Sequence, residues 1–293
     1  MTRTTLVAGL AALGLFGCAL PTAPEALGPP AKETIVAVDA SQQLLRFNAG
    51  QPQKLLDRRA LAGLQPGERV LGIDYRVARG QLFALGSSGR LYRIDTATAA
   101  ATPVGAPLAI ALRGNEFGVD FNPTVDRLRV VSDAGQNLRL HPDTGAVVDA
   151  DLKTEGLQID GTLAYDAADA NAGRTPAVVA AGYTYNQQDE KLTTNFAIDA
   201  RQGVLVTQGS RESMQPAVSP NTGRLWTVGP LNAGAFERAS LDISDVNTTA
   251  YAALTAHDTR SSRWVRIDLA TGAATPIGSI AGGQPVVGIA IEP

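Results

Sequence analysis

The chain has 293 residues, of which 44% are hydrophobic and 18% are charged, and its formal net charge is −3. This is the composition of a globular protein with enough apolar residues to build a core. The near-neutral charge and the lack of a basic stripe exclude the electrostatic pattern of a nucleic-acid-binding protein, so we expect no nucleic-acid partner.

The N-terminus has the pattern of a lipoprotein signal peptide. Residues 1–17 carry one cation, Arg3, and an apolar run that is too short for a comfortable transmembrane span. Cys18 follows a lipobox-like sequence and is the only cysteine of the chain, so it cannot form an internal disulfide. We therefore expect Cys18 to be lipidated; the alternative is a plain secretory signal that is cleaved beyond it.

A lipid on Cys18 would anchor the protein to a membrane. Because Ala19 and not Asp follows the cysteine, we expect an exported lipoprotein of the outer membrane, facing the periplasm or the cell surface. Residues 18–33 are rich in Pro and Ala, which favours an extended tether. We expect one folded domain over residues 34–293.

The body reads as an all-β domain. Short runs with a period near two, such as residues 81–86, 127–132 and 264–269, alternate with small turns that contain Gly, Asn or Asp. No segment keeps a helical period over three turns. The leucine-rich residues 53–64 could form a turn of helix.

Segments of the body repeat. GIDY (72–75) and GVDF (118–121) are each followed by a turn, a strand, a Gly-containing hairpin and a third strand. A further copy runs from SLDI (240–243) to residue 278, and a looser one starts at GTLAYD (161–166). Four short strands that recur every 40–50 residues are typical of a β-propeller, because one such sheet can bury its faces only against neighbouring copies.

The ends of the body are expected to close the ring. The last run, residues 286–293, has the character of an innermost strand, whereas residues 34–61 supply only later strands. Sharing one blade between the two ends leaves no open edge. Counting innermost strands near residues 72, 118, 161, 240 and 288 predicts five blades; six would follow if residues 218–228 formed a blade of their own.

The run GVDFNPTVDRLRVVSDAGQNLRLHPDTG (118–145) and the C-terminal residues 250–291 resemble a bacterial family catalogued as domain of unknown function 4394. The similarity covers nearly the whole body. The family's Asn-Pro turn is present as Asn122-Pro123, and its Gln-Asn hairpin as Gln136-Asn137. The resemblance implies an exported, propeller-like domain and implies no activity.

Three aspartates occupy the same position of the expected innermost strands: Asp74, Asp120 and Asp242. In a propeller they would face one central channel, where three carboxylates repel one another unless a cation or hydrogen-bond donors intervene. One interpretation is a metal site, with calcium as the cation. The other is that each aspartate accepts hydrogen bonds from backbone amides or from an arginine such as Arg76 or Arg127.

The sequence offers no set of catalytic residues. His141 and His257 lack metal-spaced partners and are expected in turns or on the surface. Residues 166–173 lack the distal Glu of a calcium loop, and no nucleophile elbow or phosphate-binding loop occurs.

We therefore expect a non-catalytic binding or scaffold propeller, monomeric, that holds a protein or glycan partner on one face. The alternatives are a calcium-dependent hydrolase or lactonase that uses the carboxylate ring, and a purely structural component of the envelope.

Overall fold

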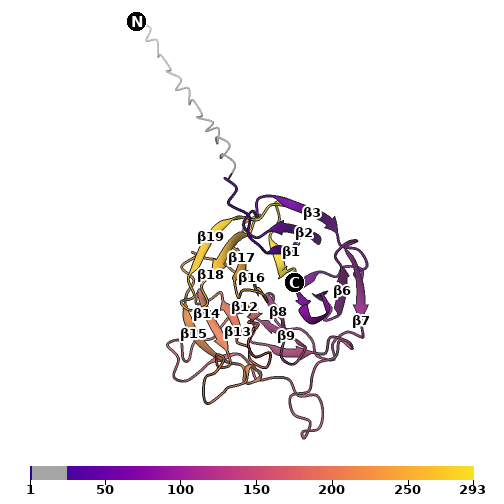
Figure 1. Ribbon diagram of the computed structural model, residues 1–293, viewed down its shortest axis with the longest axis vertical. Helices are drawn as coiled ribbons and strands as arrows, with labels where there is room; N and C mark the ends of the chain where they lie inside the picture. The colour runs from indigo at the N-terminus through magenta and orange to yellow at the C-terminus, as the bar shows by residue number, and fades with distance from the viewer. Residues whose placement is uncertain (2–24) are drawn as a thin grey trace.

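The computed structural model describes Met1 and residues 25–293. Apart from Met1, the predicted signal peptide lies outside the described residues, and so does Cys18. Twenty strands and two short 3-10 turns make up the body, and the strands form five small sheets arranged around one axis as a five-bladed β-propeller (Figure 1). Within the described part of the chain, no helix is long and apolar enough to cross a membrane.

Each blade is a small sheet whose innermost strand lies at the axis. From the axis outward, the strands of blade 1 are β20 (Val286–Ile291), β1 (Thr34–Asp39), β2 (Gln43–Asn48) and β3 (Leu55–Ala60). The strands of blade 2 are β4 (Val70–Arg76), β5 (Gln81–Gly86), β6 (Leu91–Asp95) and β7 (Ala100–Val104).

Blades 3 to 5 complete the ring. The strands of blade 3 are β8 (Phe117–Asn122), β9 (Arg127–Ser132) and β10 (Asn137–Leu140). Those of blade 4 are β12 (Val178–Tyr183), β13 (Asn195–Asp199), β14 (Val204–Gln208), β15 (Arg224–Pro230) and the two-residue β11 (Ala164–Tyr165). Those of blade 5 are β16 (Arg238–Ile243), β17 (Ala250–Thr255), β18 (Arg263–Ile267) and β19 (Ala274–Ser279).

The two ends of the chain close the ring as the sequence predicted. β20 pairs antiparallel with β1, with Val36 opposite Ala290, so the last strand of the chain lies inside the first. This pairing satisfies the backbone groups that would otherwise form an exposed strand edge.

One detail of the sequence-based prediction was wrong, and two alternatives that the sequence left open are not realised. The innermost strand of blade 4 is β12 and not the segment near residue 161, because β11 pairs in parallel with β15 at the outer edge. Residues 218–228 form no sixth blade, since their strand, β15, is part of blade 4. The long insertions before β12 hid this order. Residues 53–64 hold no helix; β3 occupies their centre because it completes the sheet of blade 1.

Glycine at the axis allows the innermost strands to approach one another. A Cβ on Gly118 would lie 2.5 Å from the carbonyl carbon of Ala180 on β12, and one on Gly288 would lie 2.8 Å from the backbone nitrogen of Ile73 on β4. A side chain at either position would force neighbouring blades apart. The recurrence of glycine two residues before the inward-facing position therefore follows from crowding at the centre of the ring.

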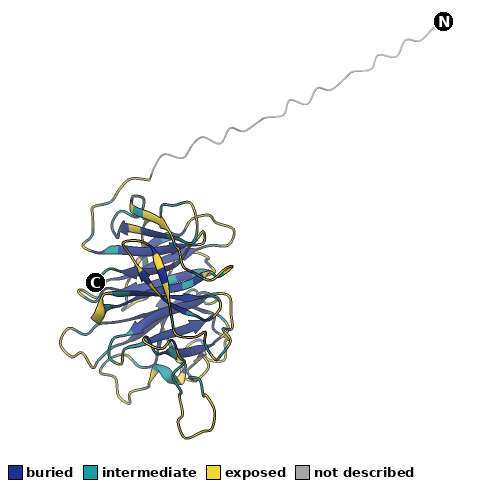
Figure 2. Cartoon of the chain, turned by 90° about the vertical axis from the view of Figure 1, so that its right-hand side faces the viewer, coloured by how far each residue is buried: buried dark blue, intermediate teal, exposed yellow. Residues whose placement is uncertain are grey.

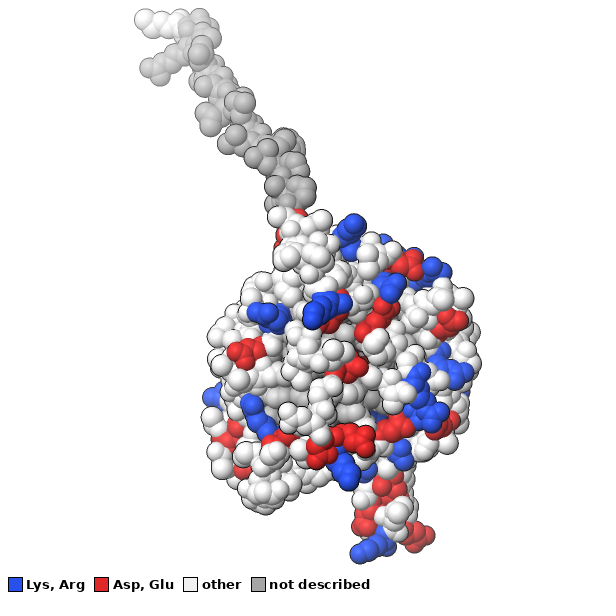
Figure 3. Space-filling model, in the orientation of Figure 1, with Lys and Arg blue, Asp and Glu red and all other residues white. Residues whose placement is uncertain are grey.

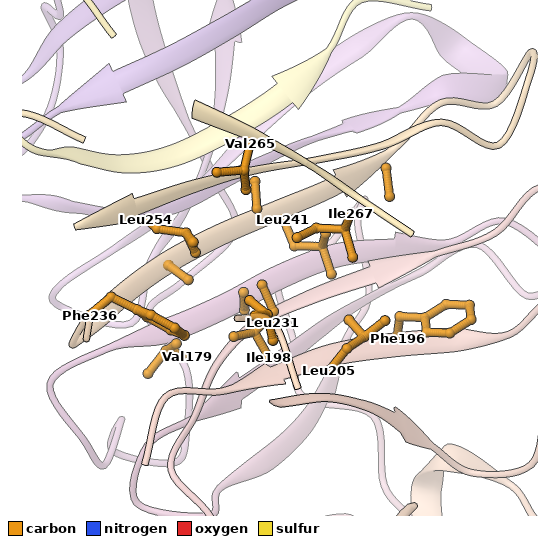
Figure 4. Close-up of a cluster of buried hydrophobic side chains, with 14 of the residues drawn as sticks. Val179, Phe196, Ile198, Leu205, Leu231, Phe236, Leu241, Leu254, Val265 and Ile267 are labelled. Atoms are coloured by element: carbon orange, nitrogen blue, oxygen red, sulfur yellow. The ribbon is translucent and has the colours of Figure 1, made fainter. Parts of the chain in front are cut away.

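The hydrophobic core is divided among the interfaces between blades. Figure 2 shows most strands buried, while the connecting loops and parts of the outer strands are exposed. The largest cluster lies between blades 4 and 5, where Ile198 and Leu205 meet Leu241, Leu254 and Val265 (Figure 4). Burial of such side chains stabilises the fold by about 2 kcal/mol each. The blade 3–blade 4 interface differs, because its apolar cluster takes only Val131 from blade 3.

Candidate functional site

The three aspartates predicted to face the channel do converge. Asp74 on β4, Asp120 on β8 and Asp242 on β16 are buried, and each offers a carboxylate oxygen that lies within 4.8 Å of the others. Blades 1 and 4 place Ala290 and Gly182 at the corresponding position, so only three of the five blades contribute a carboxylate.

Backbone amides of the next innermost strand bind each aspartate. Asp74 Oδ2 accepts from the amide of Phe121 at 2.7 Å, and Asp120 Oδ1 accepts from that of Tyr183 at 2.9 Å. Asp242 accepts from Ile291 and from Ile243, both at 2.6 Å. The bonds from Phe121, Tyr183 and Ile291 join neighbouring blades at the axis, whereas that from Ile243 lies within β16. They also leave each carboxylate short of the solvation it would have in water.

Burial raises the pKa of all three groups. Loss of solvation raises the pKa of Asp242 to about 7, although the amides of Ile291 and Ile243 oppose the shift. The pKa values of Asp74 and Asp120 are also raised well above their ordinary value, first by burial and then by the neighbouring carboxylates. A buried ring of this kind can relieve its repulsion by binding protons or a cation.

The arginines expected beside the ring lie elsewhere. Arg76 binds Asp126 and Asp143 at the end of blade 2, and Arg127 donates to the carbonyl oxygens of residues 125 and 126. Among the described residues, no ion pair joins an arginine to the three aspartates. The charge of the ring is therefore not neutralised by a neighbouring side chain.

The histidines lie away from the channel. The side chain of His257 is 75% exposed beside Asp258, and His141 follows β10, where its Nδ1 accepts from the amide of Asp143. Residues 166–173 form a turn in which the Asp169 carboxylate accepts from Thr227 on β15. Neither feature contributes to a common site.

A second site, which sequence reasoning missed, lies between blades 3 and 4. A cavity of about 410 Å³ opens there beside the ends of β8 and β12. Its wall includes Arg127, Arg129, Arg139, Tyr183, Asn195 and Gln208. This volume lies within the range of about 300–1,000 Å³ found for small-molecule pockets. Polar groups thus occupy the interface at which the apolar packing of the ring is thinnest.

A buried guanidinium organises the wall. Arg129 is 1% exposed and donates to Asp160 at 2.6 Å, to Asn137 at 2.8 Å and to Asn221 at 2.7 Å. Its Nε donates to the hydroxyl of Tyr183 at 3.1 Å. Arg139 binds the same Asp160 through Nε and Nη2. Two arginines therefore share one carboxylate, and the network holds blade 3 against blade 4.

The side-chain amides of the wall have fixed orientations. Asn137 Nδ2 donates to the carbonyl oxygens of Gly161 and Pro220, so its Oδ1 must accept from Arg129 and from Gln208 Nε2. Gln208 Oε1 then faces Asn195 Nδ2, at 3.3 Å. The remaining atom, Asn195 Oδ1, is buried and has no partner within the described structure. The chain of hydrogen bonds therefore ends in an unused, buried acceptor on a residue that lines the cavity.

A signal for this site was present in the run RLRVV (127–131). Blades of a propeller are covered on both faces, so both faces of an inner strand should be apolar. Leu128 and Val130 face blade 2 in an apolar cluster, whereas Arg127 and Arg129 occupy the alternate positions. Two arginines on a covered face indicate a polar interface. Their partners Asp160, Asn195 and Gln208 lie in other segments and could not be assigned from sequence spacing.

A family model covers the residues of both sites. The family model described as "Domain of unknown function (DUF4394)" matches residues 43–290. The chain belongs to this family. The DUF4394 match spans all five blades and includes the aspartates of the channel and the wall of the cavity. No curated protein matches the chain.

Several solved structures are similar to the chain at low sequence identity. A chain of a nidogen/laminin complex matches with a TM-score of 0.46 and 11% identity, over 89% of this chain and 98% of the other. The glutaminyl cyclase of Myxococcus xanthus matches with a TM-score of 0.42 and 9% identity, over 73% and 76%. A protein of unknown function from Bacteroides thetaiotaomicron matches with a TM-score of 0.44 and 10% identity, over 75% and 53%. We draw no functional argument from these similarities.

Proposed function

We propose that this propeller is a non-catalytic binding protein that holds a small polar ligand in the cavity between blades 3 and 4. The proposal depends on Asn195, which lines that cavity and whose buried Oδ1 has no partner within the described structure. A buried acceptor without a partner costs the fold about 1–3 kcal/mol, and a ligand donor would offset that cost. The surrounding network fixes the orientation of the wall before a ligand arrives, which favours binding.

The proposed lipid anchor would leave the cavity between blades 3 and 4 accessible to a ligand. We propose that the protein is exported and held by a lipid on Cys18 at the outer membrane. The described chain enters the ring beside blade 1 and blade 5, where Gln51 donates to Gly28 and Ser279 donates to Glu25 (Figure 1). Blades 3 and 4 lie across the axis from this point. A tethered molecule could therefore present the cavity away from the membrane.

The face shown in Figure 3 has the mixed charge of a solvent-exposed surface and not the basic patch that would bind a polyanion. Acidic and basic side chains are interspersed over this face, in keeping with the net charge of −3. A protein or glycan partner on one face remains part of the proposal, with the polar cavity as its point of attachment.

The test is a thermal-shift screen with polar metabolites on matched variants. Val125 lines the cavity and is 55% exposed, so Val125→Trp would obstruct the cavity without disturbing the core. Val246 is 71% exposed and lies outside the cavity wall, so Val246→Trp is the control. We expect ligands that stabilise the wild type and the control but not Val125→Trp. Ligands that stabilise all three proteins equally would refute the cavity as the binding site.

A second candidate is a calcium-dependent hydrolase or lactonase centred on the channel. The observation that favours it is the convergence of Asp74, Asp120 and Asp242, whose oxygens are close enough for one calcium ion with ligand distances of about 2.3–2.6 Å. Calcium would replace protons on the ring, so we expect it to raise the melting temperature more at about pH 8 than at about pH 5.

Asp120→Asn separates this candidate from the first. If the protein is a calcium-dependent enzyme, calorimetry should detect calcium binding and a lactone should be hydrolysed only when calcium is present. Both properties should be lost in Asp120→Asn. Calcium binding without hydrolysis would leave the ring as a structural cation site. No calcium binding at about pH 8 would remove the cation hypothesis.

A further inference from the structure

We infer that the ligand of the cavity between blades 3 and 4 is a hydroxylated carboxylic acid of the size of a sugar acid. The inference rests on the proposed function and names the chemical class of its ligand. Three features of the described wall support it: its charge, the hydrogen-bond donors that it leaves unused, and the unpartnered acceptor of Asn195.

The wall carries an excess of positive charge. Three arginines line it, Arg127, Arg129 and Arg139, and within the described chain no acidic residue lines it. Asp160, behind the wall, neutralises one charge for Arg129 and Arg139 together. Among residues 25–293, no carboxylate forms an ion pair with Arg127. Three cations and one anion leave a net charge of about +2, which favours an anionic ligand and disfavours an ammonium group.

The arginines also have donors to spare. Arg139 uses Nε and Nη2 for Asp160, and Arg127 uses Nη1 for two carbonyl oxygens. No partner within the described residues takes Arg139 Nη1 or Arg127 Nη2. Guanidinium donors bind carboxylates with geometric specificity, often through two parallel hydrogen bonds. The charged end of the ligand is therefore expected between Arg127 and Arg139.

Asn195 requires a different group on the ligand, a hydrogen-bond donor. Its Oδ1 is an acceptor, and Gln208 prevents the amide from turning, because Gln208 Nε2 is held by Asn137 and by Pro220. The ligand must therefore also bring an O–H or N–H donor. Sulfate has none and a simple fatty acid has none once its carboxyl is ionised, whereas a sugar acid combines a carboxylate with several hydroxyl groups. The cavity volume of about 410 Å³ leaves room for such a ring.

The test is isothermal titration calorimetry of the folded domain with D-galacturonate and D-glucuronate. The matched probes are D-galactose and D-glucose, which lack the carboxylate, cyclohexanecarboxylate, which lacks the hydroxyls, and inorganic phosphate. We expect one-to-one binding of at least one uronate. Affinity should fall about tenfold or more when either the carboxylate or the hydroxyls are removed, and it should weaken as salt is added.

Three variants locate the two contacts. Arg127→Gln should abolish the preference for the uronate over the neutral sugar, and Asn195→Leu should abolish the preference for the uronate over cyclohexanecarboxylate. Arg260→Gln, an exposed change outside the cavity, should alter neither. Circular dichroism and melting temperatures check that each variant is folded, so a loss of binding can be assigned to the contact.

The other outcomes would each contradict a particular part of the inference. Equal binding of neutral sugar and uronate in the cavity would overturn the anionic class and leave the binding function standing. Phosphate binding as tight as uronate binding, with the same dependence on Arg127, would overturn the hydroxylated class. If no probe binds, the inference fails, while the Val125→Trp screen still decides independently whether the cavity binds a ligand at all.

Discussion

The replacement Asp242→Asn is expected to remove much of the pH dependence of stability that the central carboxylates give the fold. Burial raises the pKa of Asp242 from an ordinary 3.8 to about 7. The folded protein therefore holds a proton that the unfolded chain releases between these pH values. The resulting stabilisation is fully present below about pH 4 and is lost as pH rises through about 7.

The magnitude follows from the two pKa values. Each pH unit between them corresponds to about 1.4 kcal/mol, so Asp242 alone makes the fold about 4 kcal/mol less stable at high pH than at low pH. Asp74 and Asp120 act in the same direction, because burial and their neighbours raise their pKa values too. In Asp242→Asn the amide oxygen can still accept from Ile291, but the group takes up no proton.

The assay is urea unfolding in the presence of a chelator at about pH 5 and about pH 8. The wild type should be less stable at the higher pH by several kcal/mol. The difference should shrink by about 2.7 kcal/mol in Asp242→Asn, because only about two pH units of the titration lie between pH 5 and the pKa of about 7. Glu155→Gln, in an exposed loop, should behave like the wild type. An Asp242→Asn protein that keeps the full wild-type difference would refute the reasoning, since the titrating groups would then lie elsewhere.

Further predictions concern the ring itself, and urea unfolding measures each of them. Trp264 is fully buried, stacks on Tyr251 with centroids 5.3 Å apart and donates to Ala49, so Trp264→Leu should cost about 3 kcal/mol or more; a cost below about 1 kcal/mol would contradict this packing. Gly118→Val should destabilise more than an exposed glycine change, because its Cβ meets blade 4 backbone at 2.5 Å. Arg129→Met takes one of two arginines from Asp160, which keeps Arg139, and should cost about 1–3 kcal/mol; a neutral effect would show the network to be dispensable. Deletion of residues 286–293 opens the ring and should abolish cooperative unfolding, whereas a sharp native-like transition would argue against closure by β20.

Much of the fold could be predicted from the sequence because propeller repeats are local. The copies that begin at GIDY and GVDF each encode one blade, and glycine recurs where the innermost strands crowd the axis. The C-terminal strand could be placed because residues 34–61 lacked an innermost strand. The count of five blades, the closure and the convergence of the three aspartates all follow from this periodicity.

Blade 4 and the cavity were not predictable in the same way. Insertions of about ten residues or more separate β10, β11 and β12, so the repeat lost its register there and β11 was mistaken for an innermost strand. The cavity depends on contacts between distant segments: Asp160 follows blade 3, Gln208 ends β14 and Asn221 precedes β15. No local pattern specifies such contacts, and only the paired arginines of β9 hinted at a polar interface.

The most direct test of the account is a crystal structure of the domain grown with D-galacturonate. We expect a ligand between blades 3 and 4, with its carboxylate on Arg127 and Arg139 and a hydroxyl within about 3.2 Å of Asn195 Oδ1. A cavity that holds only water at saturating ligand, or a ligand bound elsewhere on the ring, would contradict it.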